Sequence, residues 1–224
     1  MQTQNQSLVL VAGTALLIAP QITAAQRQAA IDCLLYAQLI ANKRAGNRFA
    51  QPSIWYRAYR AVYGEIKWLV TGQAHDTQNV TAITELVISE PLQAWLGQAG
   101  IDGVQVLRRA IGGLRHHCAG QRQLEGFICP VDRLQQPVVL EIGLLDAQAH
   151  LHLCSLTWQC TASVEGAMQA SLDEMAALPA EVQLRCISLV CDVQAFEPMR
   201  SKLHTLITSK QQQTPYVLDL GITA

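Results

Sequence analysis

Residues 24–44 constrain the fold most, because they predict a helix that is apolar on nearly every side. With successive residues placed 100° apart, apolar side chains cover most of the helix surface. Thr23 followed by Gln26 has the form of a capping box, which predicts where the helix begins. Two cations followed by Gly46 are typical of a helix end. Such a helix must lie in the core, with other elements packed around it.

The rest of the chain divides into a helical part and a strand-rich part. Before Gly120 the apolar spacing predicts a buried strand at 8–12 and helices at 53–70, 77–97 and 103–118. After Gly120 the segments become short, apolar and rich in β-favouring residues. There we expect strands at 126–132, 137–146, 149–160, 184–190 and 216–220, with helices at 163–178 and 198–210.

These elements predict an α+β protein. A mostly helical N-terminal half, with about four helices, would pack on a smaller mixed β-sheet with two helices in the C-terminal half. The halves also differ in charge: residues 1–120 hold ten Lys/Arg and six Asp/Glu, whereas residues 121–224 hold six and eleven. We therefore expect a helical basic half of net charge +4 and an α/β acidic half of net charge −5, forming one compact unit because no flexible linker joins them.

The most distinctive surface signal is a segment rich in cations and aromatic residues. Between Asp32 and Glu65 the chain has no acidic residue. Helical phasing over 53–70 places cations opposite an apolar stripe, with tyrosines on the border. The candidate binding residues are Lys43, Arg44, Arg48, Arg57, Arg60, Lys67, Tyr56, Tyr59 and Tyr63.

We compare three kinds of anionic partner for this segment, and a purely structural role as the alternative. A basic helix edged by tyrosine is typical of a peripheral protein that binds an anionic lipid surface. An acidic protein partner would meet the same cations, whereas nucleic acid is disfavoured by a net charge of −1. Alternatively, the rings pack inside and the cations form a solvated rim. We take a non-enzymatic binding or effector protein at an anionic lipid surface as the leading hypothesis.

A second hypothesis is a cysteine-dependent enzyme or a zinc protein. His150, His152 and Cys154 alternate along an expected strand and so project from one face. Imidazole and thiolate are zinc ligands, which makes a site centred on His152 and Cys154 a candidate zinc centre. A nucleophilic Cys154 would need His116, His117 or His204 as its base, because residues two apart on a strand lie about 7 Å apart. The structural alternative is a strand that leaves the core at its histidine end.

The seven cysteines show no short repeating spacing, which argues against a disulfide framework. A thiol near a basic interfacial helix is a candidate for S-acylation, and Cys33, Cys118 and Cys154 are the candidates here. No cofactor is predicted, apart from a fatty acyl group or another apolar ligand held between the halves.

The sequence lacks the common motifs of nucleotide-binding proteins and hydrolases. The chain has no Walker A, dinucleotide-binding, nucleophile-elbow or H-E-x-x-H motif, which argues against an enzyme but does not exclude an active site assembled from distant residues. A cleaved signal peptide is disfavoured because no cation precedes the apolar run at 8–19. We expect a cytoplasmic or peripheral membrane protein. A cytoplasmic protein–protein adaptor, as a homodimer, is a further alternative.

Overall fold

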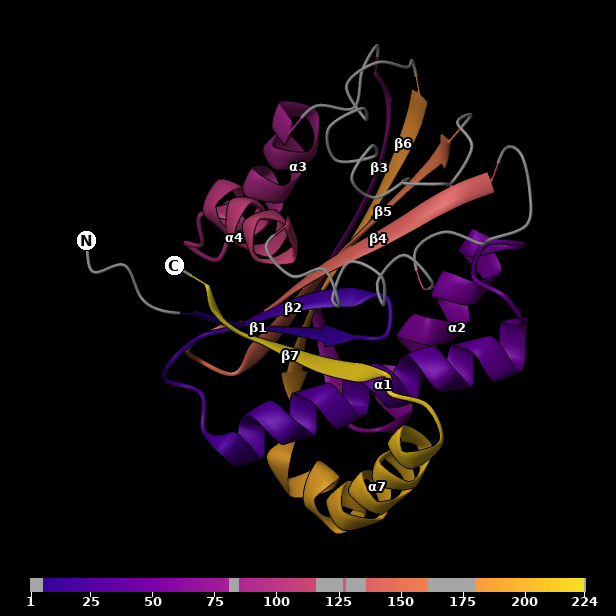
Figure 1. Cartoon of the computed structure of the whole chain (residues 1–224), viewed down its shortest axis with the longest axis vertical. Coiled ribbons are helices and arrows are strands. Elements are labelled where there is room, and N and C mark those ends of the chain that lie inside the picture. The colour runs from indigo at the N-terminus through magenta and orange to yellow at the C-terminus, as the bar shows by residue number, and fades with distance from the viewer. Residues whose placement is uncertain (1–5, 81–84, 116–126, 128–135, 161–179, 224) are drawn as a thin grey trace.

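A computed structural model describes residues 6–80, 85–115, 127, 136–160 and 180–223. Their strands form one seven-stranded sheet in the order β3-β6-β5-β4-β2-β1-β7 (Figure 1). Only β2 and β4 pair in parallel, and the other neighbours are antiparallel. The strands are β1 (Gln6–Val11), β2 (Thr14–Ile18), β3 (Trp68–Val80), β4 (Gln136–Leu145), β5 (His150–Cys160), β6 (Ala180–Cys191) and β7 (Val217–Thr223).

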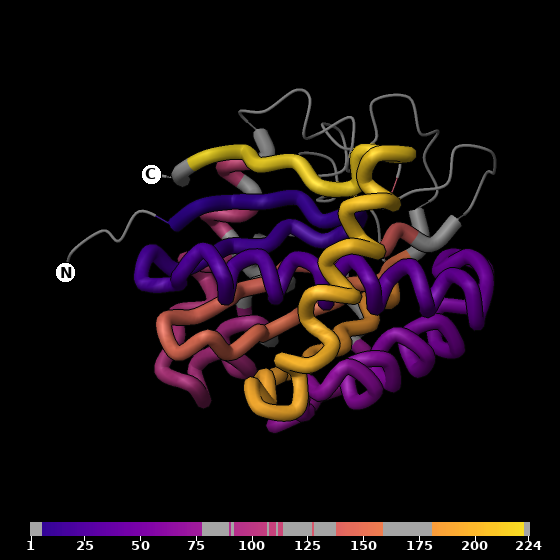
Figure 2. The backbone as a smooth tube through the Cα atoms, turned by 90° about the horizontal axis from the view of Figure 1, so that it is seen from below, coloured from indigo at the N-terminus to yellow at the C-terminus, as the bar shows by residue number. Residues whose placement is uncertain are grey.

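Helices cover both faces of this sheet. One face packs against α1 (Ala24–Ala45), α2 (Pro52–Glu65) and α7 (Val193–Gln213). The other face packs against α3 (Glu85–Gly97) and α4 (Gly103–Arg115). Each face has its own hydrophobic core, so the sheet separates two cores. Figure 2 shows α7 crossing α1 on the outside of the first of these layers.

The predicted fold class is wrong. The sheet is large rather than small, and the N-terminal half is not a helical bundle, because β1, β2 and β3 all come from it. The helices do not form one body packed on a sheet but lie on its two faces. The apolar run at 8–19 forms the β1–β2 hairpin, whose strands lie inside the sheet and are covered on both sides. A strand that is covered on both faces is apolar at successive positions, so its sequence is a continuous apolar run.

The largest local error is β3, which was expected to be the end of one helix and the start of another. This strand lies at the edge of the sheet, and most of its side chains from Leu69 to Thr77 are exposed. It therefore lacks the apolar alternation that predicts a strand. The end of α2 was also missed, because a glycine commonly marks the end of a helix and here Lys67 takes the left-handed backbone conformation instead, with φ of 66°.

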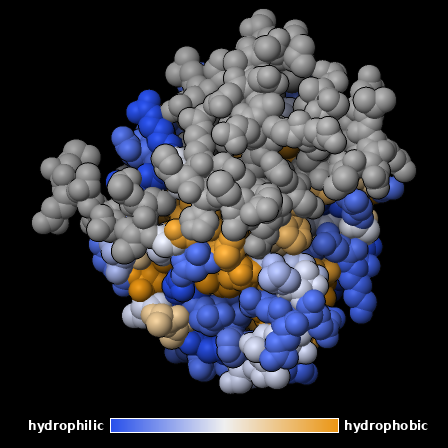
Figure 3. Space-filling view, in the orientation of Figure 1, coloured by the Kyte–Doolittle hydropathy of each residue, from blue (hydrophilic) through white to orange (hydrophobic). Residues whose placement is uncertain are grey.

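Other elements are as expected. The capping box of α1 is confirmed, since the Thr23 hydroxyl accepts from the Gln26 amide and the Gln26 side chain accepts from the Thr23 amide. The turn between β4 and β5 is confirmed at 146–149. The helix predicted at 163–178 lies outside the described residues, as does most of the strand predicted at 126–132. Within the described part of the chain, every helix is too short or too polar to cross a bilayer. The face in Figure 3 is mainly hydrophilic over α1 and α7.

Candidate functional site

A groove of about 490 Å³ lies between α2 and the outer strands β3 and β6. The chain reverses at Lys67, and β3 returns alongside α2, so that Arg60 of the helix donates to Gln73 of the strand. The register of β3 with β6 then places His75 opposite Arg185. The residues lining the groove include Tyr56, Arg57, Arg60, Gln73, His75 and Arg185.

Arg185 carries a buried positive charge at the base of this groove. Its side chain is only 8% exposed, and its Nη2 donates to the Ser53 hydroxyl at 3.1 Å and to the Gln183 side-chain oxygen at 2.7 Å. Both acceptors are neutral, so neither cancels the charge. Desolvation lowers the pKa of Arg185, as expected for a guanidinium that is removed from water and forms no ion pair with a carboxylate of the described residues.

Two further arginines add positive charge at the mouth of the groove. Arg57 is exposed, and Arg60 is half-buried with a neutral partner. No carboxylate among the described residues pairs with either guanidinium. The groove therefore combines three positive charges, and a negatively charged ligand would relieve their mutual repulsion.

Tyr56 supplies a hydroxyl that lacks a partner. Its ring lies under the guanidinium of Arg185, with 5.7 Å between that carbon and the ring centroid. The hydroxyl oxygen is buried and makes no hydrogen bond within the described chain. Desolvation raises the pKa of Tyr56 strongly, so the group stays a neutral donor. A buried donor left unpaired costs about 1–3 kcal/mol unless a ligand accepts from it.

The remaining aromatic candidates lie in the protein interior. Tyr59 and Tyr63 are fully buried, and their rings pack edge to face with centroids 5.3 Å apart. The Tyr63 hydroxyl donates to that of Tyr59, which donates to the carboxyl of Glu141 at 2.9 Å. Thr14 donates to the same carboxyl oxygen at 2.6 Å. These two phenols therefore hold α2 against the sheet and do not face a lipid surface.

The other predicted cations divide into buried, paired and exposed groups. Arg48 is buried and donates to the backbone carbonyls of Val139 and Phe127. Arg44 makes a two-pronged ion pair with Glu65, with distances of 2.6 and 2.8 Å. Lys43 and Lys67 are exposed. The structure therefore brings Tyr56, Arg57 and Arg60 together in one groove but not the whole predicted set.

The buried carboxyl of Glu141 gives a testable pH dependence. Desolvation raises its pKa above the ordinary 4.5, against the opposing effects of the Thr14 and Tyr59 hydroxyls and the Arg48 charge. A raised folded-state pKa contributes stability that is complete below about pH 4.5 and is lost as pH rises through the folded value. We expect Glu141→Gln to remove this loss, because the amide does not titrate. Urea unfolding across that pH range should show wild type losing stability relative to the variant; parallel curves would contradict this.

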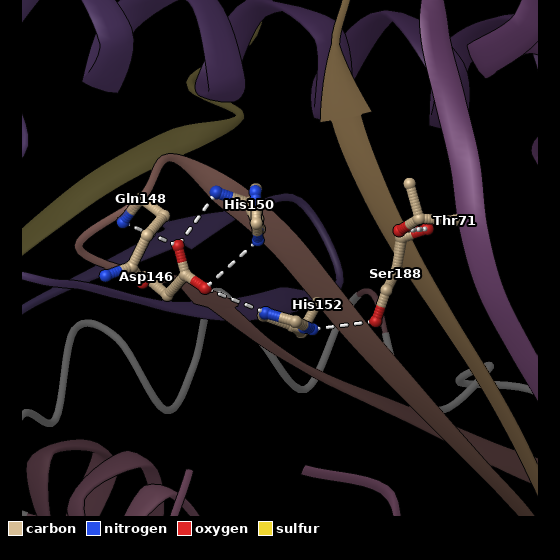
Figure 4. A network of polar contacts seen from close by, with 6 residues as sticks. All are labelled: Thr71, Asp146, Gln148, His150, His152 and Ser188. Carbon is tan, nitrogen blue, oxygen red and sulfur yellow. Dashed lines mark hydrogen bonds and ion pairs between the residues drawn. The ribbon is translucent and has the colours of Figure 1, made fainter. Parts of the chain in front are cut away.

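A second polar cluster lies at the β4–β5 turn, where His150 and His152 face the same carboxylate (Figure 4). Oδ2 of Asp146 lies 3.1 Å from Nε2 of His152 and 3.6 Å from Nδ1 of His150. Oδ1 of Asp146 accepts from the backbone amides of Gln148 and His150. Desolvation is the largest single effect and raises the pKa of Asp146, but the hydrogen bonds from the His152 ring and the His150 amide, together with the charges of both rings, lower it overall.

The predicted third member of this cluster, Cys154, lies elsewhere. Its sulfur is 3.4 Å from that of Cys186 on the neighbouring strand, and the hydrogen bond between the two thiols, with burial, raises its pKa. Cys33 is also fully buried, and desolvation raises its pKa. Both thiols lie in the interior rather than on a surface that an acyl donor could reach. Cys118 lies outside the described residues.

The sequence did not point to several residues of these sites. Arg185, Gln73 and His75 reach the groove only through the pairing of β3 with β6, which was not predicted. Asp146 was read as a turn residue, which it is, but its second oxygen also meets both imidazoles. Its place four residues before His150 and six before His152 on a hairpin was the available signal.

Comparison with known proteins gives little guidance. No family model matches the sequence, and no curated protein matches it. A solved delta-endotoxin is similar over 81% of this chain and 81% of its own, with 11% identity and a TM-score of 0.42. The Evf virulence factor is similar over 90% of this chain and 84% of its own, with 11% identity and a TM-score of 0.39. Scores this low carry no inference about function.

Proposed function

We propose that the groove between α2 and β3 binds the headgroup of an anionic lipid, and that the protein is a binding protein of anionic membrane surfaces. The observation that supports this most is the buried Arg185, which has only neutral hydrogen-bond partners among the described residues and lies over the ring of Tyr56, whose hydroxyl is unpaired. A phosphate or carboxylate oxygen would accept from both groups. Arg57 and Arg60 at the mouth would hold the remaining negative charge.

Exposed apolar side chains favour a lipid over a free anion. Both elements that form the groove expose such side chains: Ile54 of α2 is 50% exposed, and Leu69 of β3 is 56% exposed. Val70 next to it is 43% exposed. Cations beside exposed apolar residues are what a protein needs in order to lie at a membrane interface. A site for a free phosphate ion would gain nothing from them.

Vesicle co-sedimentation tests this proposal. We expect the protein to pellet with vesicles of phosphatidylcholine and phosphatidylserine but not with phosphatidylcholine alone. Each cation near an anionic surface contributes about 1 kcal/mol, so Arg57→Glu with Arg60→Glu should weaken binding by about thirtyfold or more. Lys202→Glu with Lys210→Glu on α7 is the matched control, because both lysines are exposed and the change in net charge is the same.

Tyr56→Phe distinguishes binding in the groove from non-specific electrostatic attraction to the membrane, since it leaves every charge of the protein in place. We expect it to weaken binding about tenfold, the value of one hydrogen bond to a charged acceptor. Without vesicles it should leave the protein equally or more stable, because it removes an unpaired hydroxyl. Equal pelleting with neutral and anionic vesicles, or the same loss from the α7 control pair, would overturn the proposal. Protection against heat by inorganic phosphate without vesicle binding would overturn its lipid part.

A further inference from the structure

The β4–β5 turn carries a cluster with the donor atoms of a metal site. Asp146 ends one strand, and His150 and His152 lie on the same face of the next, so the hairpin brings two imidazoles to one carboxylate. One donor atom from each residue lies within 4.8 Å of the others. The rings meet edge to face, with centroids 6.3 Å apart. We propose that Asp146, His150 and His152 bind a divalent transition metal of the zinc type.

The spacing of the donor atoms fits tetrahedral coordination. Zinc bonds to nitrogen and oxygen are about 2.0–2.1 Å long, which separates tetrahedral donors by about 3.3 Å. The distances from Oδ2 of Asp146 to the two ring nitrogens are 3.1 and 3.6 Å, on either side of that value. Binding a metal ion would then require that the two ring nitrogens, which lie within 4.8 Å of each other, take up the same separation.

The surroundings of His152 already fix its orientation. Its Nδ1 lies 2.7 Å from the hydroxyl of Ser188 on β6, and its Nε2 is directed to Asp146. Thr71 of β3 donates to the backbone carbonyl of Ser188, which ties that residue to the next strand. A histidine that binds a metal usually has its other ring nitrogen held in this way, and such partners set the ring orientation and the tautomer.

Differences in burial leave one side of the cluster open. The side chains of His152 and Asp146 are 6% and 10% exposed, whereas that of His150 is 43% exposed. A metal bound here would have three protein ligands and an open position toward solvent for water or a further ligand. Two imidazoles and one carboxylate are a donor set suited to zinc and neighbouring first-row metals. Cys154 is not part of it, because its sulfur contacts Cys186.

Calorimetric titration of the chelator-treated full chain with zinc alone tests the proposal. We expect saturable binding of one ion, and cobalt should give the visible absorption of a tetrahedral site. Loss of a ligand should cost more than loss of an outer partner, so His150→Ala should weaken binding by more than about a hundredfold. His204→Ala is the matched control, since it removes another exposed histidine that faces a carboxylate, that of Asp32, and it should bind zinc as wild type does.

Asp146→Asn provides a second variant that keeps the fold. Its amide oxygen can still accept from the backbone amides of Gln148 and His150, while the negative ligand is lost. We expect it to lose zinc binding and the tetrahedral cobalt spectrum while its far-ultraviolet circular dichroism stays that of wild type. The proposal would be overturned if wild type showed no saturable binding, or if His150→Ala and Asp146→Asn bound zinc as tightly as wild type. The titration contains no lipid, so its failure leaves the groove unaffected.

Discussion

Replacing Arg48 by methionine is expected to lower the free energy of unfolding by about 2–6 kcal/mol, because two carbonyl acceptors would lose their donor at a cost of about 1–3 kcal/mol each. The side chain is only 7% exposed, and burial lowers its pKa to about 10, although the charge of Glu141 opposes that effect. Its Nη2 donates to the carbonyl of Val139 at 3.0 Å and to that of Phe127. Methionine would fill the space but leave these acceptors unpaired.

Arg57→Met is the control for this change. Arg57 is exposed, so its replacement should lower the free energy of unfolding by less than about 0.5 kcal/mol. Glu141→Gln should reduce the destabilisation caused by Arg48→Met, since the negative charge that the Arg48 guanidinium stabilises is then absent. Urea unfolding of the four combinations of Arg48→Met and Glu141→Gln measures this coupling. If Arg48→Met costs less than about 1 kcal/mol, or the two changes simply add, Arg48 does not stabilise the fold through these carbonyls and the charge of Glu141 as described.

Gly103→Ala is expected to destabilise the protein by about 3 kcal/mol, the upper end of the usual cost of overpacking. Gly103 begins α4 at its closest approach to α3, and an added Cβ would lie 2.6 Å from the carbonyl oxygen of Leu92 and 2.7 Å from the amide nitrogen of Gln93. Both are backbone atoms, so α3 itself would have to move. Thermal unfolding with a urea series gives the change in stability.

Gly112→Ala in the same helix should have the opposite sign. An added Cβ there would have no atom of the described residues within 4 Å, and Gly112 lies within the helix. Alanine should therefore stabilise by up to about 1 kcal/mol, its advantage over glycine in a helix interior. If both substitutions shift stability in the same direction, the contact between α3 and α4 is not as close as described.

Local signals in the sequence predicted several elements correctly. The capping box and the apolar surface of α1 marked a core helix, and most of its residues from Ala29 to Ala41 are buried. The β-favouring runs on either side of Asp146 predicted the β4–β5 hairpin. In each case the evidence lies within one segment, where propensity and pattern act together.

Features that depend on pairing between distant segments were missed. The polar residues of β3 show no pattern that indicates a strand. This segment is a strand because it pairs antiparallel with β6, from Trp68 opposite Cys191 to Val80 opposite Ala180. The groove depends on that pairing, so its lining could not be assembled from residues 43–67 alone. Helical phasing placed Tyr59 on the border between the polar and apolar faces of the helix. In the structure its phenol is buried, because its hydroxyl donates to the buried carboxyl of Glu141.

The two candidate sites show the same limit. The alternation of His150 and His152 indicated that they share a face, and they do. The same alternation extended to Cys154, yet that sulfur meets the neighbouring strand's Cys186. Asp146 was assigned a turn role because Asp is frequent in turns, and a turn role does not exclude a second one.

The pairing of β1 with β7 has a consequence for how this protein is made. Leu10 lies opposite Leu218, so β1, which is synthesised before the other described strands of this sheet, finds one of its two neighbours only when nearly all the described chain has been synthesised. Until then one edge of the β1–β2 hairpin stays open, with unpaired amides on apolar strands, the kind of edge that invites association between nascent chains. We therefore expect chaperones to engage this protein during translation, and a chain shortened before Val217 to accumulate in aggregates.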